Sequence, residues 1–202
     1  MTRTVIRLIP CFFLPLELML HYAPIPLLLS VLALSGCQRE SPSAPSASNI
    51  LAINDFDNLD GWLANSPAAA TLSRSQAHSG AYSIRVDSTQ EFSLGYANTL
   101  GRLAPDWPAK LIVSAWVLLP SDQAGAKLVM EVKGATPNAP NLLWDGLALN
   151  KAVKAYNKWQ YVEQIITMPD AARPTNRLQV YLWRADSKLP VYLDDLKIEL
   201  AE

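Results

Sequence analysis

Short stretches in which apolar and polar residues alternate recur along the chain from residue 83 onward. Alternation with a period of two places successive side chains on opposite faces, which is typical of β-strands in a sheet with one buried face. Residues that favour turns, mainly Pro, Gly, Ser and Asp, separate these stretches. The pattern predicts strands over residues 83–87, 111–119, 127–133, 159–168, 177–184 and 191–200.

The stretches between these strands contain little helical pattern. Residues 146–156 have some helical character but begin without a capping residue. Several short strands with turns between them are typical of an all-β antiparallel sandwich. We therefore predict one β-sandwich domain over residues 49–202, a length that fits a single domain.

The last predicted strand contains two adjacent aspartates that interrupt its alternation. Val191 and Leu193 share one face, and the apolar pattern resumes at Leu196, one position out of phase, after Asp194 and Asp195. One extra residue in a strand indicates a β-bulge, and paired carboxylates also suit a bound cation.

The strand over residues 177–184 has two chemically different faces. The face predicted to meet the core carries Leu178, Val180 and Leu182. The opposite face carries Gln179, Tyr181 and Trp183. Aromatic rings suit the apolar C–H faces of sugars, while polar neighbours bind the hydroxyls, so this face is a candidate binding surface.

Other residues extend or compete with this candidate. Trp144, predicted in a loop with Asn141 and Asp145, would rim the same surface. Further candidates on it are Tyr96, Glu131 and Lys133. The alternative role for the aromatic residues is to fill the core or cover a sheet edge, and we expect it of Trp62, Trp116 and Trp159.

A different pattern precedes the strands. Residues 1–36 begin with Arg3 and Arg7 and continue through an apolar, proline-interrupted stretch without another Lys or Arg. This is typical of a secretion signal. The alternative, an uncleaved membrane anchor, conflicts with the prolines that break a spanning helix. Translation from Met19 instead of Met1 would remove both arginines.

The apolar stretch ends in Leu34-Ser35-Gly36-Cys37, which resembles the lipobox of bacterial lipoproteins. The resemblance implies that residues 1–36 are removed and that Cys37 is acylated, for example with palmitate, which anchors the chain to a membrane. Gln38 rather than Asp follows the cysteine; by resemblance to the usual sorting rule, this favours the outer membrane of the cell envelope. Residues 37–48, rich in Pro, Ser and Ala, predict a flexible tether.

Composition removes several classes of function. The chain has 17 basic and 18 acidic residues, a balance that gives no electrostatic footprint for nucleic acid. Its two cysteines, Cys11 and Cys37, precede the predicted domain, so that domain has neither a disulfide nor a thiolate zinc site. His78 is expected in an exposed turn, and no G-x-S-x-G motif occurs. We expect no enzyme activity.

The order of several short motifs resembles the jelly-roll carbohydrate-binding modules attached to bacterial xylanases and cellulases, within the galactose-binding-like superfamily. The motifs are Phe56-Asp57 with Gly61-Trp62, then residues 77–86 (AHSGAYSIRV), 113–117 (VSAWV), 159–162 (WQYV) and 191–196 (VYLDDL). The resemblance implies a jelly roll that binds a polysaccharide or oligosaccharide. The residues that we expect to bind it on the concave sheet are those singled out above: Tyr181, Trp183, Gln179 and Trp144.

The resemblance also implies a structural Ca²⁺ ion. The positions that match its ligands are Asp57, Ser79 or Gly80 through the backbone, and Asp194 or Asp195. Asp57 replaces the glutamate that is usual in the family. The alternative is that these aspartates cap turns or pair with Arg85 or Lys197.

Three hypotheses follow for function. The first is a lipid-anchored protein whose non-catalytic sandwich binds carbohydrate. The second is an envelope lipoprotein that docks a protein partner, and the third is a divergent polysaccharide-acting enzyme. The first requires exposed rings in a groove, the second an exposed apolar patch, and the third two close carboxylates in a pocket.

Overall fold

The computed structural model describes residues 49–201, apart from residues 62, 64–65, 105–107 and 137. The predicted signal peptide, the lipobox cysteine Cys37 and the tether therefore lie outside the described residues. Within the described segments, no helix has the length and apolar character needed to cross a membrane.

Strands make up most of the regular secondary structure of the described chain, as the alternating pattern predicts. They are β1 (Ile50–Asn54), β2 (Leu72–Ser73), β3 (Ser83–Val86), β4 (Phe92–Thr99), β5 (Lys110–Leu118), β6 (Lys127–Lys133), β7 (Leu143–Ala148), β8 (Gln160–Thr167), β9 (Arg177–Trp183) and β10 (Val191–Leu200). The helices are short: the 3₁₀ turn η1 (Pro67–Thr71), α1 (Leu100–Leu103) and α2 (Leu149–Ala152).

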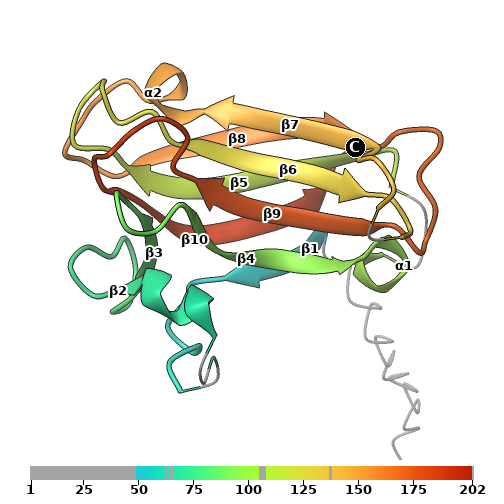
Figure 1. The fold of residues 1–202 in the computed structure, drawn as a ribbon, viewed down its shortest axis with the longest axis horizontal. Helices are drawn as coiled ribbons and strands as arrows, with labels where there is room; N and C mark the ends of the chain where they lie inside the picture. The colour runs from blue at the N-terminus through green and yellow to red at the C-terminus, as the bar shows by residue number, and fades with distance from the viewer. Residues whose placement is uncertain (1–48, 62, 64–65, 105–107, 137, 202) are drawn as a thin grey trace, which may run out of the picture. The chain divides into compact units, whose positions relative to one another are not determined.

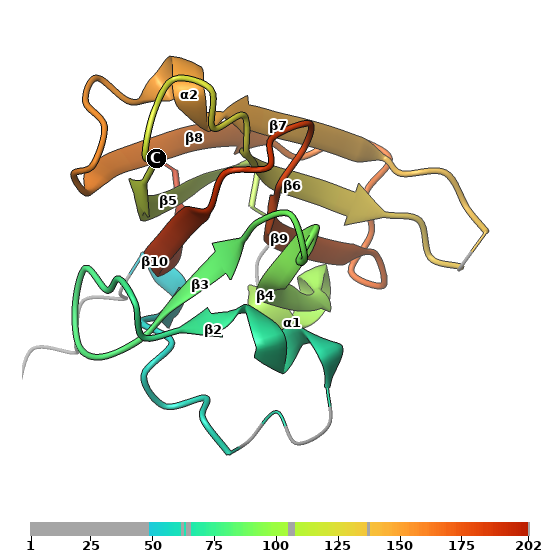
Figure 2. The ribbon, with the colours of Figure 1, turned by 60° about the vertical axis from the view of Figure 1, so that its left-hand side comes forward.

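The strands form two antiparallel sheets that pack face to face (Figures 1 and 2). One sheet has the order β2-β3-β10-β5-β8, with β1 also paired to β10. The other has the order β4-β9-β6-β7. The predicted all-β antiparallel sandwich of the jelly-roll type is confirmed.

The core lies between the sheets and is filled by alternate residues of the central strands. Leu178, Val180 and Leu182 of β9 are completely buried, as their spacing predicts. Val113 and Val117 of β5, in the other sheet, belong to the same core cluster and are equally buried. Burial of such a side chain stabilises the fold by about 1.5–3 kcal/mol. This packing fixes which face of β9 points outward.

Prediction of individual strands succeeded where alternation is regular. The bounds of β6 and β10 agree with the predicted ranges. Those of β3 and β9 differ by one residue at one end, and those of β5 and β8 by one residue at both ends. Four strands, β1, β2, β4 and β7, were not predicted. Both β4 and β7 contain a glycine that interrupts the apolar pattern. The helical character of residues 146–156 corresponds only to the four residues of α2, since residues 146–148 belong to β7.

The irregularity predicted in the last strand is a β-bulge. Asp194 pairs with Trp116 of β5, but the next paired residue of β10 is Lys197, opposite Ser114. One extra residue on β10 is thus accommodated, and Asp195 takes a left-handed conformation with φ of 48°. The turn predicted at Gly80 also has positive φ, 54°.

Candidate functional site

The outward side chains of the four-stranded sheet form the surface that holds most of the predicted ligand-binding residues. We call it the β9 face, and it comprises Phe92, Lys127, Glu131, Lys133, Trp144, Arg177, Gln179, Tyr181 and Trp183. The strand register arranges them in rows. Trp183 lies between Phe92 and Lys127, and Gln179 lies beside Glu131, which is followed by Trp144.

Aromatic rings gather at one end of this face. The rings of Phe92 and Trp183 are nearly parallel, with centroids 6.3 Å apart and an interplanar angle of 12°. Tyr181 meets Phe92 edge to face at 5.9 Å, and Trp144 meets Trp183 in the same way at 6.3 Å. Phe92 is 51% and Trp144 47% exposed, so ring surface is open to solvent. Such rings can stack on a flat apolar ligand face.

A lysine lies among these rings. The Nζ atom of Lys127 is 5.4 Å from the centroid of Trp183 and 5.6 Å from that of Trp144. These distances allow cation–π attraction, which orients the two indoles around the ammonium group. The Trp183 indole N–H also donates a hydrogen bond of 3.3 Å to Glu91. The aromatic end is thus held by polar contacts while its rings stay accessible.

A hollow of about 320 Å³ lies beside Tyr181, between β9 and β4. Gly95, Ala97, Glu131 and Gln179 contribute to its lining. Burial raises the pKa of Tyr181, and the negative charge of Glu131 raises it further. The phenol is therefore neutral at physiological pH and can donate a hydrogen bond to a ligand hydroxyl.

The opposite end of the β9 face is polar. Lys133 and Arg177 are direct partners across the β6–β9 pair. They line a hollow of about 440 Å³ together with Thr99, Asn141 and Gln179. Lys133 Nζ lies 2.9 Å from Glu131, and the Asn141 amide donates a 2.9 Å hydrogen bond to the same carboxylate. Glu131 is only 4% exposed, so its charge is satisfied within the protein.

The structure brings the predicted ligand-binding residues together. Tyr181, Trp183 and Gln179 lie on the outward face of β9, an inner strand of its sheet, and Trp144 lies two strands away on the same face. The predicted location of Trp144 in a loop is wrong, because it lies within β7. Whether these residues bind a ligand stays a prediction.

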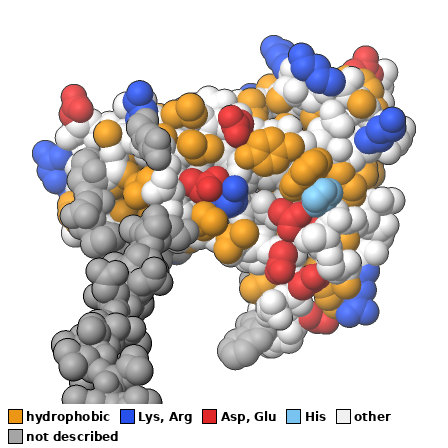
Figure 3. All heavy atoms as spheres, turned by 180° about the vertical axis from the view of Figure 1, so that it is seen from behind, with side chains coloured by type: hydrophobic (Ala, Val, Ile, Leu, Met, Phe, Trp, Pro, Cys, Tyr) orange, Lys and Arg blue, Asp and Glu red, His pale blue; other side chains and the backbone are white. Residues whose placement is uncertain are grey.

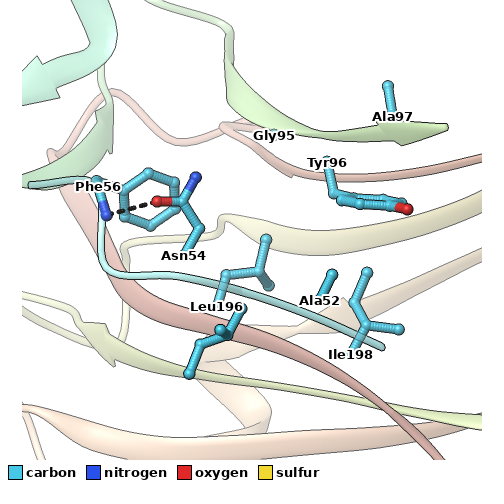
Figure 4. Close-up of a pocket in the computed structure, with 9 residues that line it drawn as sticks. Ala52, Asn54, Phe56, Gly95, Tyr96, Ala97, Leu196 and Ile198 are labelled. Atoms are coloured by element: carbon cyan, nitrogen blue, oxygen red, sulfur yellow. Dashed lines mark hydrogen bonds between the residues drawn. The ribbon is translucent and has the colours of Figure 1, made fainter. Parts of the chain in front are cut away.

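Tyr96 differs from the other candidates. It pairs with the inward-facing Val180, so its side chain points away from the β9 face. Figure 4 shows Tyr96 beside a crevice at the open side of the sandwich, facing Ala52 and Ile198 of the other sheet. The crevice has a volume of about 250 Å³ and is mainly apolar, which makes it an extension of the core gap.

Sequence reasoning missed Phe92 and Lys127. Lys127 alternates with Val129 and Glu131 in β6, so its face could be predicted, but its neighbour across the sheet could not. Phe92 begins β4, where a register shift between Phe92 and Gly95 obscures the alternation. Both become candidates only once β9 is known to lie between β4 and β6.

The residues predicted to bind calcium converge on the turn formed by residues 78–81. Asp57 Oδ1 accepts hydrogen bonds of 2.8 Å from the backbone N–H groups of both Ala81 and Tyr82. Asp194 Oδ2 accepts from the N–H groups of His78 and Ser79 at 2.8 and 3.1 Å.

The Asp195 carboxylate contacts two side chains of the same turn, those of Ser79 and His78. It accepts a 2.6 Å hydrogen bond from the Ser79 hydroxyl and lies 2.6 Å from His78 Nδ1. Asp194 Oδ1 accepts from the Asp195 N–H. The carboxylates therefore act as acceptors for the turn, as the alternative hypothesis expects.

The fit of calcium to this turn is mixed. Carboxylate and hydroxyl oxygens are the ligands that calcium prefers. However, all four carboxylate oxygens of Asp194 and Asp195 are engaged, three by groups of the turn and one by the Asp195 N–H. Within the segments that the structure describes, no group of three or more His, Cys, Asp or Glu side chains is placed to hold a metal ion. Calcium stays a prediction.

The two described tryptophans assigned to the core or a sheet edge lie on the outside of the six-stranded sheet. Trp116 is half-buried there, and the imidazole of His78 stacks on it at 4.0 Å with an interplanar angle of 12°. Trp159 meets the same imidazole edge-on at 5.8 Å. Neither belongs to the core between the sheets, while His78 lies in an exposed bend, as predicted. Trp62 lies outside the described residues.

Comparison with solved structures identifies the fold. The tandem CBM22-1–CBM22-2 domain of Paenibacillus barcinonensis Xyn10C matches with a TM-score of 0.51 and 17% identity, over 80% of this chain and 52% of that chain. The chain has the jelly-roll fold of a carbohydrate-binding module.

Two single modules match at similar identity. The CBM22-1 xylan-binding domain of the same Paenibacillus barcinonensis protein gives a TM-score of 0.47 and 19% identity, over 79% of this chain and 99% of that chain. The C-terminal family 22 module of Clostridium thermocellum Xyn10B gives 0.48 and 14%, over 78% and 98%. No protein-family model and no curated protein sequence matches this chain.

Proposed function

We propose that this protein binds carbohydrate on the β9 face without catalysing a reaction. The observation that carries the proposal is the group of rings formed by Phe92, Tyr181, Trp183 and Trp144 on the outside of the sheet, in which Phe92 and Trp144 are exposed and the other two rings half-buried. Aromatic rings of this kind offer stacking surfaces for the C–H faces of sugar rings. The fold supports the proposal, although fold alone does not determine function.

The polar groups around the rings suit an oligosaccharide or polysaccharide. Gln179 and Tyr181 share the outward face of β9. Gln179 lines both the hollow beside Tyr181 and the hollow at Lys133 and Arg177. Hydroxyl groups of a sugar chain can exchange hydrogen bonds with these side chains while its rings stack at the aromatic end. We infer that the ligand chain runs along β9.

A binding screen of the full chain against neutral and acidic polysaccharides tests this function. We expect retention by at least one glycan and loss of retention in Trp183→Ala. The matched control is Trp159→Ala, which removes a half-buried tryptophan just before β8, on the side of the opposite sheet. Absence of binding to every glycan, with a folded protein, would contradict the proposal.

A second candidate function, docking of a protein partner, is favoured by the opposite surface. The outward side of the six-stranded sheet exposes Ile53 by 67%, Ile165 by 56% and Tyr161 by 48%. Figure 3 shows this side, where hydrophobic side chains are interspersed with charged ones. The charged neighbours include Glu163, Lys197 and Glu199, which divide the apolar surface. A single continuous apolar patch would favour docking more strongly, so we place this function second.

The third hypothesis, a polysaccharide-acting enzyme, lacks a comparable observation. Glycosidases pair two carboxyl groups within about 5–10 Å in the site. On the described β9 face, Glu131 is engaged by Lys133 and Asn141, and Glu91 accepts from Trp183 at the other end. We propose binding rather than hydrolysis.

We also propose that the chain is a lipid-anchored protein of the bacterial envelope, with the outer membrane favoured. The proposal rests on the lipobox-like run that ends at Cys37. Acyl chains add about 0.8 kcal/mol of membrane affinity per buried CH₂. Labelling of growing cells with palmitate should mark the wild-type chain and leave Cys37→Ser unlabelled; equal labelling of both would contradict acylation at this residue.

A further inference from the structure

The two ends of the β9 face differ in charge as well as in shape. At the aromatic end, the ammonium group of Lys127 lies over the rings of Trp144 and Trp183, and Glu91 accepts a hydrogen bond from the Trp183 indole. At the polar end, Lys133 and Arg177 face outward as direct partners on neighbouring strands. Like charges placed opposite each other destabilise a sheet. The polar end thus carries an unfavourable arrangement in the unliganded protein.

One carboxylate only partly relieves this arrangement. Glu131 is almost fully buried and forms an ion pair with Lys133, with 2.9 Å between the carboxylate and the Lys133 Nζ atom. Arg177 is exposed, and within the described part of the chain no carboxylate lies within ion-pairing distance of it. The guanidinium therefore retains its five donors for another partner.

The surroundings of Arg177 can bind an anionic group. The hollow at this end is lined by the cations Lys133 and Arg177 together with neutral donors, among them Thr99, Asn141 and Gln179. Arginine binds a planar carboxylate through two parallel hydrogen bonds, which gives it both affinity and orientation. A carboxylate on the ligand would also remove the repulsion between the two cations.

Resting on the proposed carbohydrate function, we propose that the β9 face selects acidic polysaccharides. The uronate carboxylate binds in the hollow at Arg177 and Lys133, while neighbouring sugars stack on the rings around Trp183. Lys127 and Lys133 are six residues apart on β6, so the two ends lie about 20 Å from each other. A short oligosaccharide segment is long enough to reach both.

The test measures affinity for matched pairs of glycans. The probes are glucuronoxylan, polygalacturonate and alginate, each compared with its own carboxyl-reduced form, which keeps the backbone and removes the charge. Binding of the full chain is measured by affinity electrophoresis at low and at high salt. We expect at least one acidic form to bind about three- to tenfold more tightly than its reduced form. The difference should shrink as salt rises.

Two variants test whether the preference for acidic glycans comes from the hollow at Arg177 and Lys133. Arg177→Gln should bring the ratio of affinities to about one, since it removes the guanidinium. Lys158→Gln, which removes an exposed positive charge from the loop before β8, should keep the wild-type ratio. An equal fall in both variants of the ratio of affinities for acidic and carboxyl-reduced glycan would overturn the inference. It would show that the preference for the acidic form comes from the net charge of the protein and not from the hollow at Arg177.

The outcomes separate the inference from the function on which it rests. Binding of the acidic and reduced forms with equal affinity overturns the acidic preference and leaves carbohydrate binding intact. Binding of none of the six glycans by a folded protein overturns both. The inference is supported if Arg177→Gln loses the preference for the acidic glycan at an unchanged melting temperature while Lys158→Gln keeps it.

Discussion

Gly95 lies directly opposite Tyr181 across the β4–β9 pair, and there is no room for a side chain at position 95. A Cβ atom there would lie 2.1 Å from the carbonyl oxygen of Val180 and 2.8 Å from the Cβ of Tyr181. The absence of a side chain lets the edge strand approach the strand that carries the candidate binding residues. It also keeps open the hollow beside the phenol ring.

Gly95→Ala should therefore destabilise the fold by about 1–3 kcal/mol, because the backbone of one strand must move. The melting temperature should fall by roughly 2–4 °C for each kcal/mol. Gly125→Ala is the matched control, since its added Cβ would meet only Ser187, at 3.8 Å. Equal melting temperatures of the two variants, measured by circular dichroism, would contradict this account of Gly95.

Trp183→Ala should weaken glycan binding by about tenfold or more, equivalent to roughly 1.4 kcal/mol, because it removes the ring that contacts both Phe92 and Trp144. The side chain is only half-buried, so the loss of stability should be smaller than for a core residue. Isothermal titration with the glycan found in the screen measures the change. A larger loss of affinity in Trp159→Ala would move the binding surface to the opposite sheet.

Stability should respond to pH through Asp194, which is completely buried. Burial raises its pKa above the ordinary value, although hydrogen bonds from His78, Ser79 and Asp195 oppose the shift. The folded state then holds more protons than the unfolded state in the interval between the unfolded pKa and the higher folded pKa. The contribution is fully present below the unfolded pKa and is lost as pH rises through the folded pKa.

Comparison with Asp194→Asn isolates this effect. The variant should be less stable at every pH, by about 1–3 kcal/mol, because an amide keeps only one acceptor oxygen, and its NH₂ group would face an N–H donor at the position of the second carboxylate oxygen. Relative to the variant, the wild type should lose stability as pH rises from 3 toward 7, through a window that starts near about 3.9. The neighbouring pair His78 and Asp195 is present in both proteins. A difference in unfolding free energy that grows with pH would contradict the sign.

Calcium, if bound at the turn of residues 78–81, should stabilise the folded protein by mass action. At a concentration of 100 times the dissociation constant, the gain is about 2.7 kcal/mol. Calorimetry of the full chain in excess calcium and in chelator should then give different melting temperatures, and Asp57→Asn should reduce the difference. Identical melting temperatures would show that hydrogen bonds to Asp57, Asp194 and Asp195 are sufficient to hold this turn.

Local features of the fold followed from spacing alone. The separation of Leu178, Val180 and Leu182 from Gln179, Tyr181 and Trp183 is confirmed, because a strand turns successive side chains to opposite faces whatever its neighbours. The bulge after Asp194 and the positive φ of Gly80 also depend on a few consecutive residues.

The composition of the candidate site depended on the tertiary structure. Trp183 acquires Lys127 and Phe92 as neighbours, and Arg177 acquires Lys133, only through pairing of strands distant in sequence. Strand order and register arise from packing of the whole core between two sheets, which no single segment encodes. The sequence by itself therefore determined which side chains of β9 point outward, and the fold decided which rings and charges stand beside them.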